Sequence, residues 1–178
     1  AILPSYKDPL LIPTIQSLLD NSELGNIEVI AVFDGYYPTF KLIDDPRVRY
    51  VHLGKNRGMR GAINAGVLIS RGEFIMRADE HQTFGKGYDR IMTESCQPNW
   101  IMTARRYLLD PVKWERMDLP PVDYMDLKIS GGKFSGVAKP GNDEMIQESR
   151  AMQGSMWLMP RKWWDDVIGE LQTEGYGP

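Results

Sequence analysis

The sequence predicts an α/β domain with a mostly parallel central sheet, for three reasons. Strand-like apolar segments alternate with helix-like segments over most of the chain, as in domains built from strand–helix–strand units. Residues 27–33 are apolar except for Glu28, which is typical of a strand covered on both faces. Residues 58–70 read as a helix whose small side chains allow close packing on a sheet, namely Gly61, Ala62, Ala65 and Gly66.

The other elements of the first 104 residues follow from the same patterns. A strand is expected at residues 1–4, ending at Pro4-Ser5. A helix is expected from Leu10 to about Asn21, because Asp8 can cap its amino end and apolar residues follow at helical spacing. The remaining predicted elements are strands at 27–33, 48–53, 74–78 and 100–104 and helices at 58–70 and 88–94.

Residues 105–150 interrupt this pattern with many prolines and glycines. A long irregular segment inside a compact domain is typical of a functional lid or a binding segment. Regular structure is predicted to return with a strand at 151–159, followed by a helix that begins at Pro160 and ends at Gly169. We therefore expect a single domain with three parts, residues 1–104, 105–150 and 151–178. We also expect a fragment truncated at both ends, because the chain opens on what looks like half a strand and no element closes it.

Composition excludes several classes of function. The chain of 178 residues has a formal net charge of −3, which offers no electrostatic footprint for nucleic acid. No run of about 18 apolar residues is present, so we expect no transmembrane segment. Cys96, the single cysteine, excludes an internal disulfide and favours a reducing compartment. We expect the cytoplasm, with membrane association of a longer protein left open.

Residues 74–81 place two metal-competent side chains at the end of a predicted strand. Side chains alternate along a strand, so Asp79 and His81 project to the same side if the extended geometry continues to residue 81. A carboxylate and an imidazole there can hold a divalent cation, which in turn can hold an anion such as a diphosphate. A polar turn without a metal is the alternative interpretation.

Polar residues also follow three other predicted strands. In an open α/β sheet, ligands bind beyond the carboxyl ends of the strands. We call the polar segments that follow the predicted strands polar breaks; they are Pro4-Ser5-Tyr6, Asp34-Gly35, residues 54–58 and residues 79–81. Each polar break by itself resembles a common turn, but four of them in series predict a binding site.

The order and spacing of these segments resemble the family 2 glycosyltransferases, which have the nucleotide-diphospho-sugar-binding GT-A fold. The resemblance covers most of residues 1–100 and returns at 151–169. It is carried by residues 3–6, 29–35, 56–66 and 71–79. It implies a Rossmann-like three-layer sandwich in which residues 1–104 bind the nucleotide and residues 151–178 form the acceptor-side strand and helix.

The resemblance implies roles for the residues that match the family's motifs. Residues at the end of the first strand would line the nucleobase pocket, namely Pro4, Ser5 and Tyr6. Asp34 would accept a hydrogen bond from the base, most simply a uracil. Asn56, Gly58 and Arg60 would lie near the ribose and the diphosphate.

Asp79 would open the family's metal-binding motif, which is usually Asp-x-Asp. Here His81 occupies the third position, and Asp-x-His resembles the motif of the polypeptide N-acetylgalactosaminyltransferases, which share the fold and use manganese with UDP-sugars. Imidazole is softer than carboxylate, so the change favours Mn²⁺ over Mg²⁺ as the cofactor. Asp79 and His81 are the expected metal ligands.

The resemblance also implies an acceptor side. Gln153, Gly154 and Ser155 are candidates for contacting the donor sugar. An inverting enzyme needs a carboxylate to take the proton of the acceptor hydroxyl. Glu174 is the candidate base within this chain, although the family's spacing suggests a base beyond Pro178. A retaining mechanism stays open because of the Asp-x-His motif.

The expected function is transfer of a hexosyl or N-acetylhexosaminyl group from a UDP-sugar donor to a glycan, lipid-linked or protein acceptor. A second possibility is a module that binds a nucleotide-sugar or glycan without catalysis. A third is a sugar-phosphate nucleotidyltransferase. That chemistry needs a Gly-rich, basic loop after the first strand, which residues 5–8 do not provide.

Overall fold

The computed structural model describes residues 1–122, 124–131, 133–138, 144, 146–149, 151 and 154–174. The chain forms two compact units. The first comprises Ala1–Met102 and Leu158–Pro178, and the second comprises Thr103–Trp157. The first unit contains the polar strand ends that the sequence predicts to form a site.

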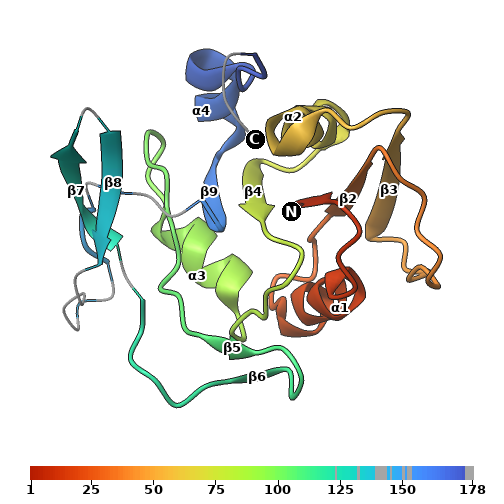
Figure 1. The fold of residues 1–178 in the computed structure, drawn as a ribbon, viewed down its shortest axis with the longest axis horizontal. Helices are drawn as coiled ribbons and strands as arrows, with labels where there is room; N and C mark the ends of the chain where they lie inside the picture. Colours follow the sequence, from red (N-terminus) through yellow and green to blue (C-terminus); the bar gives the residue numbers. More distant parts are fainter. Residues whose placement is uncertain are drawn as a thin grey trace. The chain divides into compact units, whose positions relative to one another are not determined.

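The largest sheet has five strands in the order β3-β2-β1-β4-β9. Its pairs β1–β2, β2–β3 and β1–β4 are parallel, which confirms the predicted α/β class with a mostly parallel sheet. Figure 1 shows α1 and α3 on one side of the sheet and α2 and α4 on the other. The strands are β1 (Ile2–Ser5), β2 (Val29–Asp34), β3 (Val48–Leu53), β4 (Phe74–Ala78) and β9 (Met156–Pro160).

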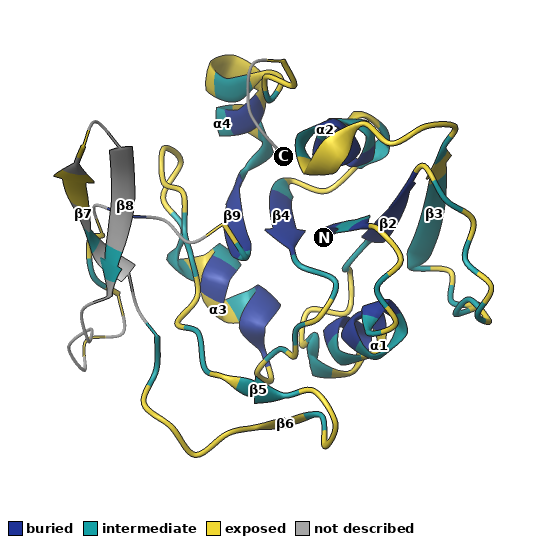
Figure 2. Ribbon diagram, in the orientation of Figure 1, coloured by how far each residue is buried: buried dark blue, intermediate teal, exposed yellow. Residues whose placement is uncertain are grey.

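The core lies where helices cover the central strands. Every residue of β2 is buried, as expected for a strand covered on both faces (Figure 2). Helix α1 (Leu11–Asn21) buries an apolar stripe that includes Ile15 and Leu18. Helix α2 (Gly58–Ile69) packs closely on β1, since a Cβ on Gly66 would lie 2.5 Å from Ile2 Cγ2. The expectation that small residues permit close packing is confirmed at Gly66.

Several predicted elements differ from the structure in their bounds. Helix α1 begins at Leu11, because the Asp8 carboxylate accepts a hydrogen bond from the N–H of Leu10 (2.8 Å) and holds a turn before the helix. The strand expected at 100–104 is a single bridge between Met102 and Leu158, whose backbones exchange two hydrogen bonds of 2.8 Å. The strand expected to start at residue 151 starts at Met156.

The helices after β4 follow the predicted order. Helix α3 (Tyr88–Ser95) lies where a short helix was predicted. The helix expected from Pro160 is α4 (Arg161–Trp163), continued by the π-helical turn η1 (Trp164–Ile168). Gly169 follows this turn with a left-handed φ of 64°, which suits a residue without a Cβ.

The second unit contains two short antiparallel pairs in the segment expected to be irregular. Strand β5 (Leu109–Asp110) pairs with β6 (Glu115–Arg116), and β7 (Tyr124–Ser130) pairs with β8 (Lys133–Ala138). Gly131, at the turn between β7 and β8, has a φ of 58°, which favours glycine. The glycine that suggested irregular structure therefore marks a hairpin turn.

Candidate functional site

The strand order places a topological switch point between β1 and β4. From β1 the chain adds β2 and β3 on one side, and then crosses to add β4 on the other side of β1. Loops that leave neighbouring strands in opposite directions open a crevice beyond their carboxyl ends, where open α/β sheets bind ligands. The loops at this switch point are residues 6–8 after β1 and residues 79–82 after β4.

Side chains join these two loops directly. The N–H of Tyr6 donates to Glu80 Oε1 at 2.9 Å, and His81 Nδ1 lies 2.8 Å from Asp8 Oδ2. Burial raises the pKa of the Glu80 carboxyl, while the hydrogen bond from Tyr6 counteracts part of this shift. The structure therefore brings two of the four predicted polar breaks together at the switch point.

The loop after β4 is also fixed to α1. Thr14, a fully buried residue of α1, donates through Oγ1 to the carbonyl of Glu80 and accepts from the N–H of Gln82, both at 3.0 Å. The N–H of Phe84 donates to Ser17 Oγ at 2.9 Å. These bonds position the loop that carries the predicted metal ligands on a helix of the core.

The other two polar breaks meet each other. Asp34 is 4% exposed, and its Oδ1 accepts a hydrogen bond of 2.7 Å from the N–H of Arg57. Gly35 has a φ of 77°, and a Cβ there would lie 2.3 Å from the backbone nitrogen of Asn56. Asn56 Oδ1 in turn accepts from the N–H of Gly58 at 3.1 Å. One oxygen of Asp34 thus holds the loop before α2, and its predicted contact with a base stays a prediction.

Aromatic side chains surround the end of β1. Ser5 is buried, and its Oγ lies 2.5 Å from the hydroxyl of Tyr36. The Tyr6 ring is 53% exposed and meets the Tyr36 ring edge-on at 6.1 Å between centroids. Lys7 has a left-handed φ of 64°, an uncommon conformation for a non-glycine residue. Backbone conformations of this kind cluster at ligand sites.

Asp79 and His81 are held by different neighbours. Strand β4 ends at Ala78 and residues 80–81 form a bend, so the alternation that would place both side chains on one side does not extend to His81. The Asp79 carboxylate pairs with the Arg77 guanidinium, and the Asp79 N–H donates to Gln82 Oε1 at 3.0 Å. The condition that the extended geometry continues to residue 81 is not met, and a shared metal stays a prediction.

The donor atoms at this position nevertheless suit a cation. Asp8 engages Nδ1 of His81, which orients the ring and leaves Nε2 to bind a metal. Asp79 is partly exposed and offers carboxylate oxygens. Within the described residues, no group of three or more His, Cys, Asp or Glu side chains is arranged to hold a metal ion. A cation held by Asp79 and His81 would leave its other coordination positions to phosphate oxygens and water.

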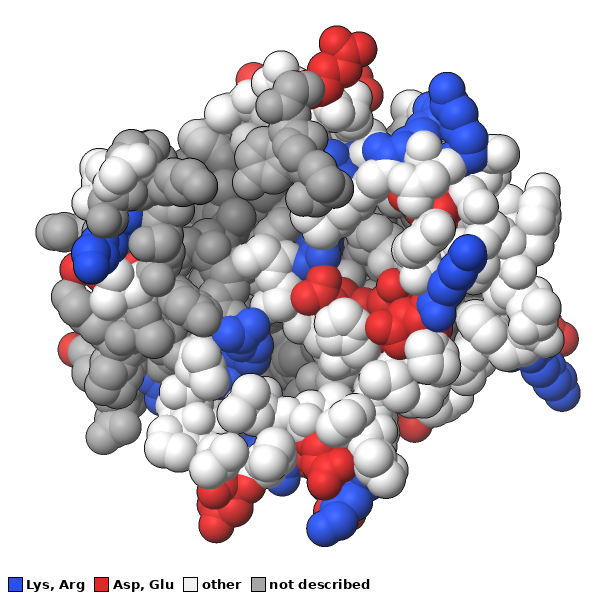
Figure 3. All heavy atoms as spheres, in the orientation of Figure 1, with Lys and Arg blue, Asp and Glu red and all other residues white. Residues whose placement is uncertain are grey.

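Figure 3 shows acidic side chains gathered beside basic ones near the middle of the drawn face.

Arg60 contacts the segment that follows η1. Its Nη1 donates to the carbonyl of Gln172 at 3.0 Å, and Asn64 exchanges hydrogen bonds of 2.8 and 2.9 Å with the backbone of Leu171. These contacts attach the segment after η1 to α2. These contacts do not involve a ligand, so the predicted role of Arg60 beside the diphosphate stays a prediction.

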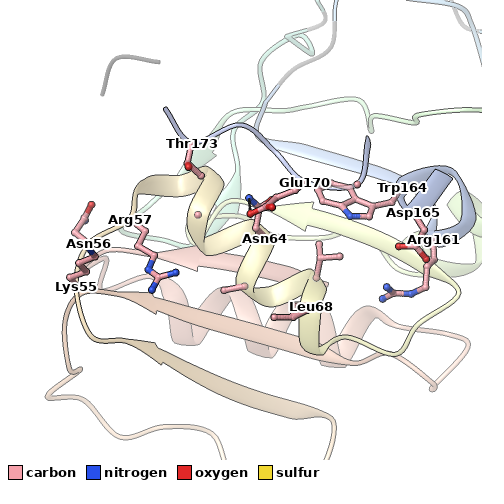
Figure 4. Close-up of a pocket in the computed structure, with 14 residues that line it drawn as sticks. Lys55, Asn56, Arg57, Asn64, Leu68, Arg161, Trp164, Asp165, Glu170 and Thr173 are labelled. Atoms are coloured by element: carbon pink, nitrogen blue, oxygen red, sulfur yellow. Dashed lines mark hydrogen bonds between the residues drawn. The ribbon is translucent and has the colours of Figure 1, made fainter. Parts of the chain in front are cut away.

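A cleft of about 800 Å³ lies along α2 beside that segment. Lys55, Asn56 and Arg57 stand at one end of it, and Arg161 and Asp165 stand at the other (Figure 4). Of the residues predicted for the site, only Asn56 is among those lining this cleft. The cleft and the switch point are therefore separate features.

The structure describes three of the four residues predicted for the acceptor side. Glu174 is exposed, and Gln153 lies outside the described residues. Gly154 and Ser155 precede β9 in the second unit. Their predicted roles stay predictions.

Sequence reasoning assigned no individual site role to four residues that the structure brings to the switch point, namely Asp8 as the partner of His81, Tyr36, Arg77 and Glu80. A signal for Arg77 was present, because it is the one charged residue within the apolar segment 74–78. The hydrogen-bond partners of Asp8, Tyr36 and Glu80 lie 31 to 74 residues away in sequence, so no local pattern indicated these contacts.

Comparison with known proteins identifies the class. Residues 1–98 match the family model for glycosyl transferase family 2. The match covers more than half of the chain, and the chain belongs to this family, whose members take a nucleotide-sugar donor and an acceptor.

Solved structures show the same fold. The crystal structure of S. aureus TarS 1-349 is 13% identical with a TM-score of 0.63, and the match covers 99% of this chain and 50% of that one. The crystal structure of HddC from Yersinia pseudotuberculosis is 12% identical with a TM-score of 0.54, and the match covers 98% of this chain and 83% of that one. The predicted GT-A fold is confirmed. The chain spans half the length of the TarS chain, and a comparison with curated proteins gives no match.

No helix among the described residues combines the length and the apolar character needed to cross a membrane.

Proposed function

We propose that this glycosyltransferase domain moves a sugar from a UDP-sugar to an acceptor hydroxyl with the help of a divalent cation, preferably Mn²⁺. The observation that carries the proposal is the convergence of the loops after β1 and β4 at the switch point. Tyr6, Asp8, Glu80 and His81 meet there through hydrogen bonds. The same edge of the sheet carries Asp79, one residue beyond β4.

The nucleotide would bind beside the aromatic side chains at the end of β1. The exposed Tyr6 ring offers a face on which a base can stack, and Tyr36 packs against its edge. The neighbouring Asp34 would accept a hydrogen bond from the N3–H of a uracil. The loop that precedes α2 would lie along the ribose and diphosphate, where a helix amino end favours negative charge.

The diphosphate end would be held by Asp79 and His81 through a cation. When bound there, a divalent cation stabilises the negative charge that develops on the leaving diphosphate. Asp8 orients the imidazole of His81, and Thr14 holds the loop in place from α1. An oriented ligand set limits the reorganisation needed during the reaction.

Transfer also requires removal of the proton from the acceptor hydroxyl in an inverting mechanism. Glu174 is the candidate for this role within the chain. We propose a hexosyl or N-acetylhexosaminyl donor and a glycan, lipid-linked or protein acceptor, in keeping with the resemblance described above.

A thermal-shift panel of UDP, GDP and ADP, each with and without Mn²⁺, tests the proposal. We expect UDP with Mn²⁺ to raise the unfolding temperature most, and Asp79→Ala to remove the part that depends on Mn²⁺. Asp165→Ala, which removes an exposed carboxylate on η1, is the matched control and should leave the shift unchanged.

Equal shifts with all three nucleotides, all indifferent to Mn²⁺, would contradict the assigned pocket. A protein that binds UDP with Mn²⁺ but neither hydrolyses UDP-sugars nor transfers sugar to any acceptor would instead support the non-catalytic binding module.

A further inference from the structure

Arg77 is a buried charge near the carboxyl end of an internal strand of the sheet. It belongs to β4, which lies between β1 and β9, and the residue is 4% exposed. Burying a guanidinium costs free energy unless an anion or other acceptors compensate it. The position therefore needs a negative partner nearby.

The guanidinium connects the two parts of the proposed diphosphate site. Its Nη2 pairs with Asp79 Oδ1 and also donates to Sδ of Met59 at 2.9 Å. Met59 is the second residue of α2, and Asp79 is the first residue after β4. A fixed positive charge thus stands between the predicted metal ligand and the helix end beside which the diphosphate is predicted.

This arrangement opposes the binding of a cation alone. The Asp79 carboxylate already neutralises Arg77, so a divalent cation must share that carboxylate and adds two positive charges close to a third. Charges of the same sign within several ångströms of each other in a partly buried site repel strongly, because the effective dielectric constant there is well below that of water. The described residues also supply no cluster of three metal ligands that would offset this repulsion.

A bound diphosphate reverses both effects, because its oxygens complete the coordination of the cation and its negative charge faces the guanidinium. We propose that Arg77 makes cation binding at Asp79 conditional on a diphosphate, so that Mn²⁺ and UDP bind cooperatively rather than independently. This inference rests on the proposed function. By linkage, UDP must strengthen Mn²⁺ binding by the same factor as Mn²⁺ strengthens UDP binding.

Two charge variants separate this role from a packing role. Arg77→Met removes the charge and keeps a long apolar stem, whereas Arg77→Lys keeps the charge and loses the planar fork. Binding of Mn²⁺ alone is measured by the electron paramagnetic resonance signal of the free ion. UDP binding is measured by calorimetry without Mn²⁺ and at saturating Mn²⁺, and far-UV circular dichroism checks that each variant is folded.

For the wild type we expect Mn²⁺ to tighten UDP binding at least about tenfold. For Arg77→Met we expect Mn²⁺ alone to bind at least about tenfold more tightly than to the wild type, with the effect of Mn²⁺ on UDP binding reduced. Arg77→Lys should behave like the wild type. Asp79→Asn combined with Arg77→Met should abolish the gain in Mn²⁺ affinity.

Several outcomes would overturn the inference. Independent binding of Mn²⁺ and UDP to the wild type does so without any variant, even if Arg77→Met does not fold. If Arg77→Met binds free Mn²⁺ no more tightly than the wild type while UDP and Mn²⁺ still bind through Asp79, the role of Arg77 is wrong and the proposed function stands. If Mn²⁺ has no Asp79-dependent effect even with UDP present, both fail.

Discussion

Single polar side chains hold the loops of the first unit by accepting hydrogen bonds from backbone N–H groups. Asp34 accepts from Arg57, Glu80 from Tyr6, and Asp89 from both Glu23 and Leu24. A buried carboxylate that accepts several such bonds is stabilised in its charged form. Removing such a carboxylate therefore leaves backbone N–H groups without their acceptor, and the loss in the free energy of unfolding is larger than the net contribution of the hydrogen bond.

Asp89→Asn tests this at α3. Asp89 is 9% exposed and accepts from Ser22 Oγ at 2.5 Å, Glu23 N–H at 3.0 Å and Leu24 N–H at 3.1 Å. An amide has one acceptor oxygen in place of two, so we expect a loss of about 1–3 kcal/mol in the free energy of unfolding at pH 7. Urea denaturation measures it, and Asp165→Asn, an exposed acid, should change stability by less than about 0.5 kcal/mol.

The same substitution has a pH signature. Burial raises the pKa of Asp89, but hydrogen bonds from Ser22 and neighbouring N–H groups outweigh it, so the net pKa lies below its ordinary value. A depressed pKa gives stability that is present above about pH 4 and is lost as pH falls through the folded-state pKa. The stability difference between wild type and Asp89→Asn should therefore shrink as pH is lowered below about 4. A difference that stays constant down to pH 2 would count against this origin.

At the scale of elements, the proposed site depends on how the loops at the carboxyl ends of the strands pack against one another and against the helices. Thr14 attaches the loop after β4 to α1. Gly35 allows the loop after β2 to approach the loop before α2. Each contact joins elements that are separated along the chain, so the geometry of the proposed site depends on the packing of whole helices and strands.

Gly35→Ala should disrupt the approach of these two loops. The new Cβ would lie 2.3 Å from the Asn56 backbone nitrogen, in addition to the strain of a φ of 77°. Gly25→Ala is the matched control, because Gly25 has a φ of 70° with no atom within 4 Å of the added Cβ. We expect the control to lose about 1 kcal/mol and Gly35→Ala at least about 2 kcal/mol more, measured by urea denaturation. Equal losses would show that the loops can move apart freely.

At the scale of the whole molecule, the proposed ligands bind across elements from both sides of the switch point. Tyr6 and Asp8 follow β1, while Asp79 and His81 follow β4. These strands are central to the sheet, so unfolding of the first unit destroys the site. Ligand binding and folding are therefore linked.

This linkage predicts a concentration dependence. At saturating Mn²⁺, the free energy of unfolding should rise by about 1.4 kcal/mol for each tenfold increase in UDP above its Kd. Urea denaturation at a series of UDP concentrations measures the slope, and for Asp79→Ala the rise should begin at higher UDP. A free energy of unfolding that does not depend on UDP would contradict specific binding to the folded state.

Local sequence patterns predicted most of the elements in the first unit. Strand β4 was predicted at 74–78 and lies at Phe74–Ala78, because an apolar run bounded by polar residues is a local signal. The hairpins of the second unit were not predicted, since pairing of short strands depends on partners in the fold as well as on local pattern. The bend at residues 80–81 was not predicted, because it depends on tertiary contacts such as the hydrogen bonds of Thr14 with the backbone of Glu80 and Gln82.

The sequence by itself determined the α/β class, the order of the elements and the polar residues at the strand ends, because side-chain periodicity and turn residues act over a few neighbouring positions. Only the tertiary structure decided which of those residues face one another. The pairing of Asp8 with His81 and of Tyr6 with Glu80 spans more than 70 residues. It exists because β1 and β4 become neighbours in the folded sheet, and that adjacency depends on the packing of the whole unit.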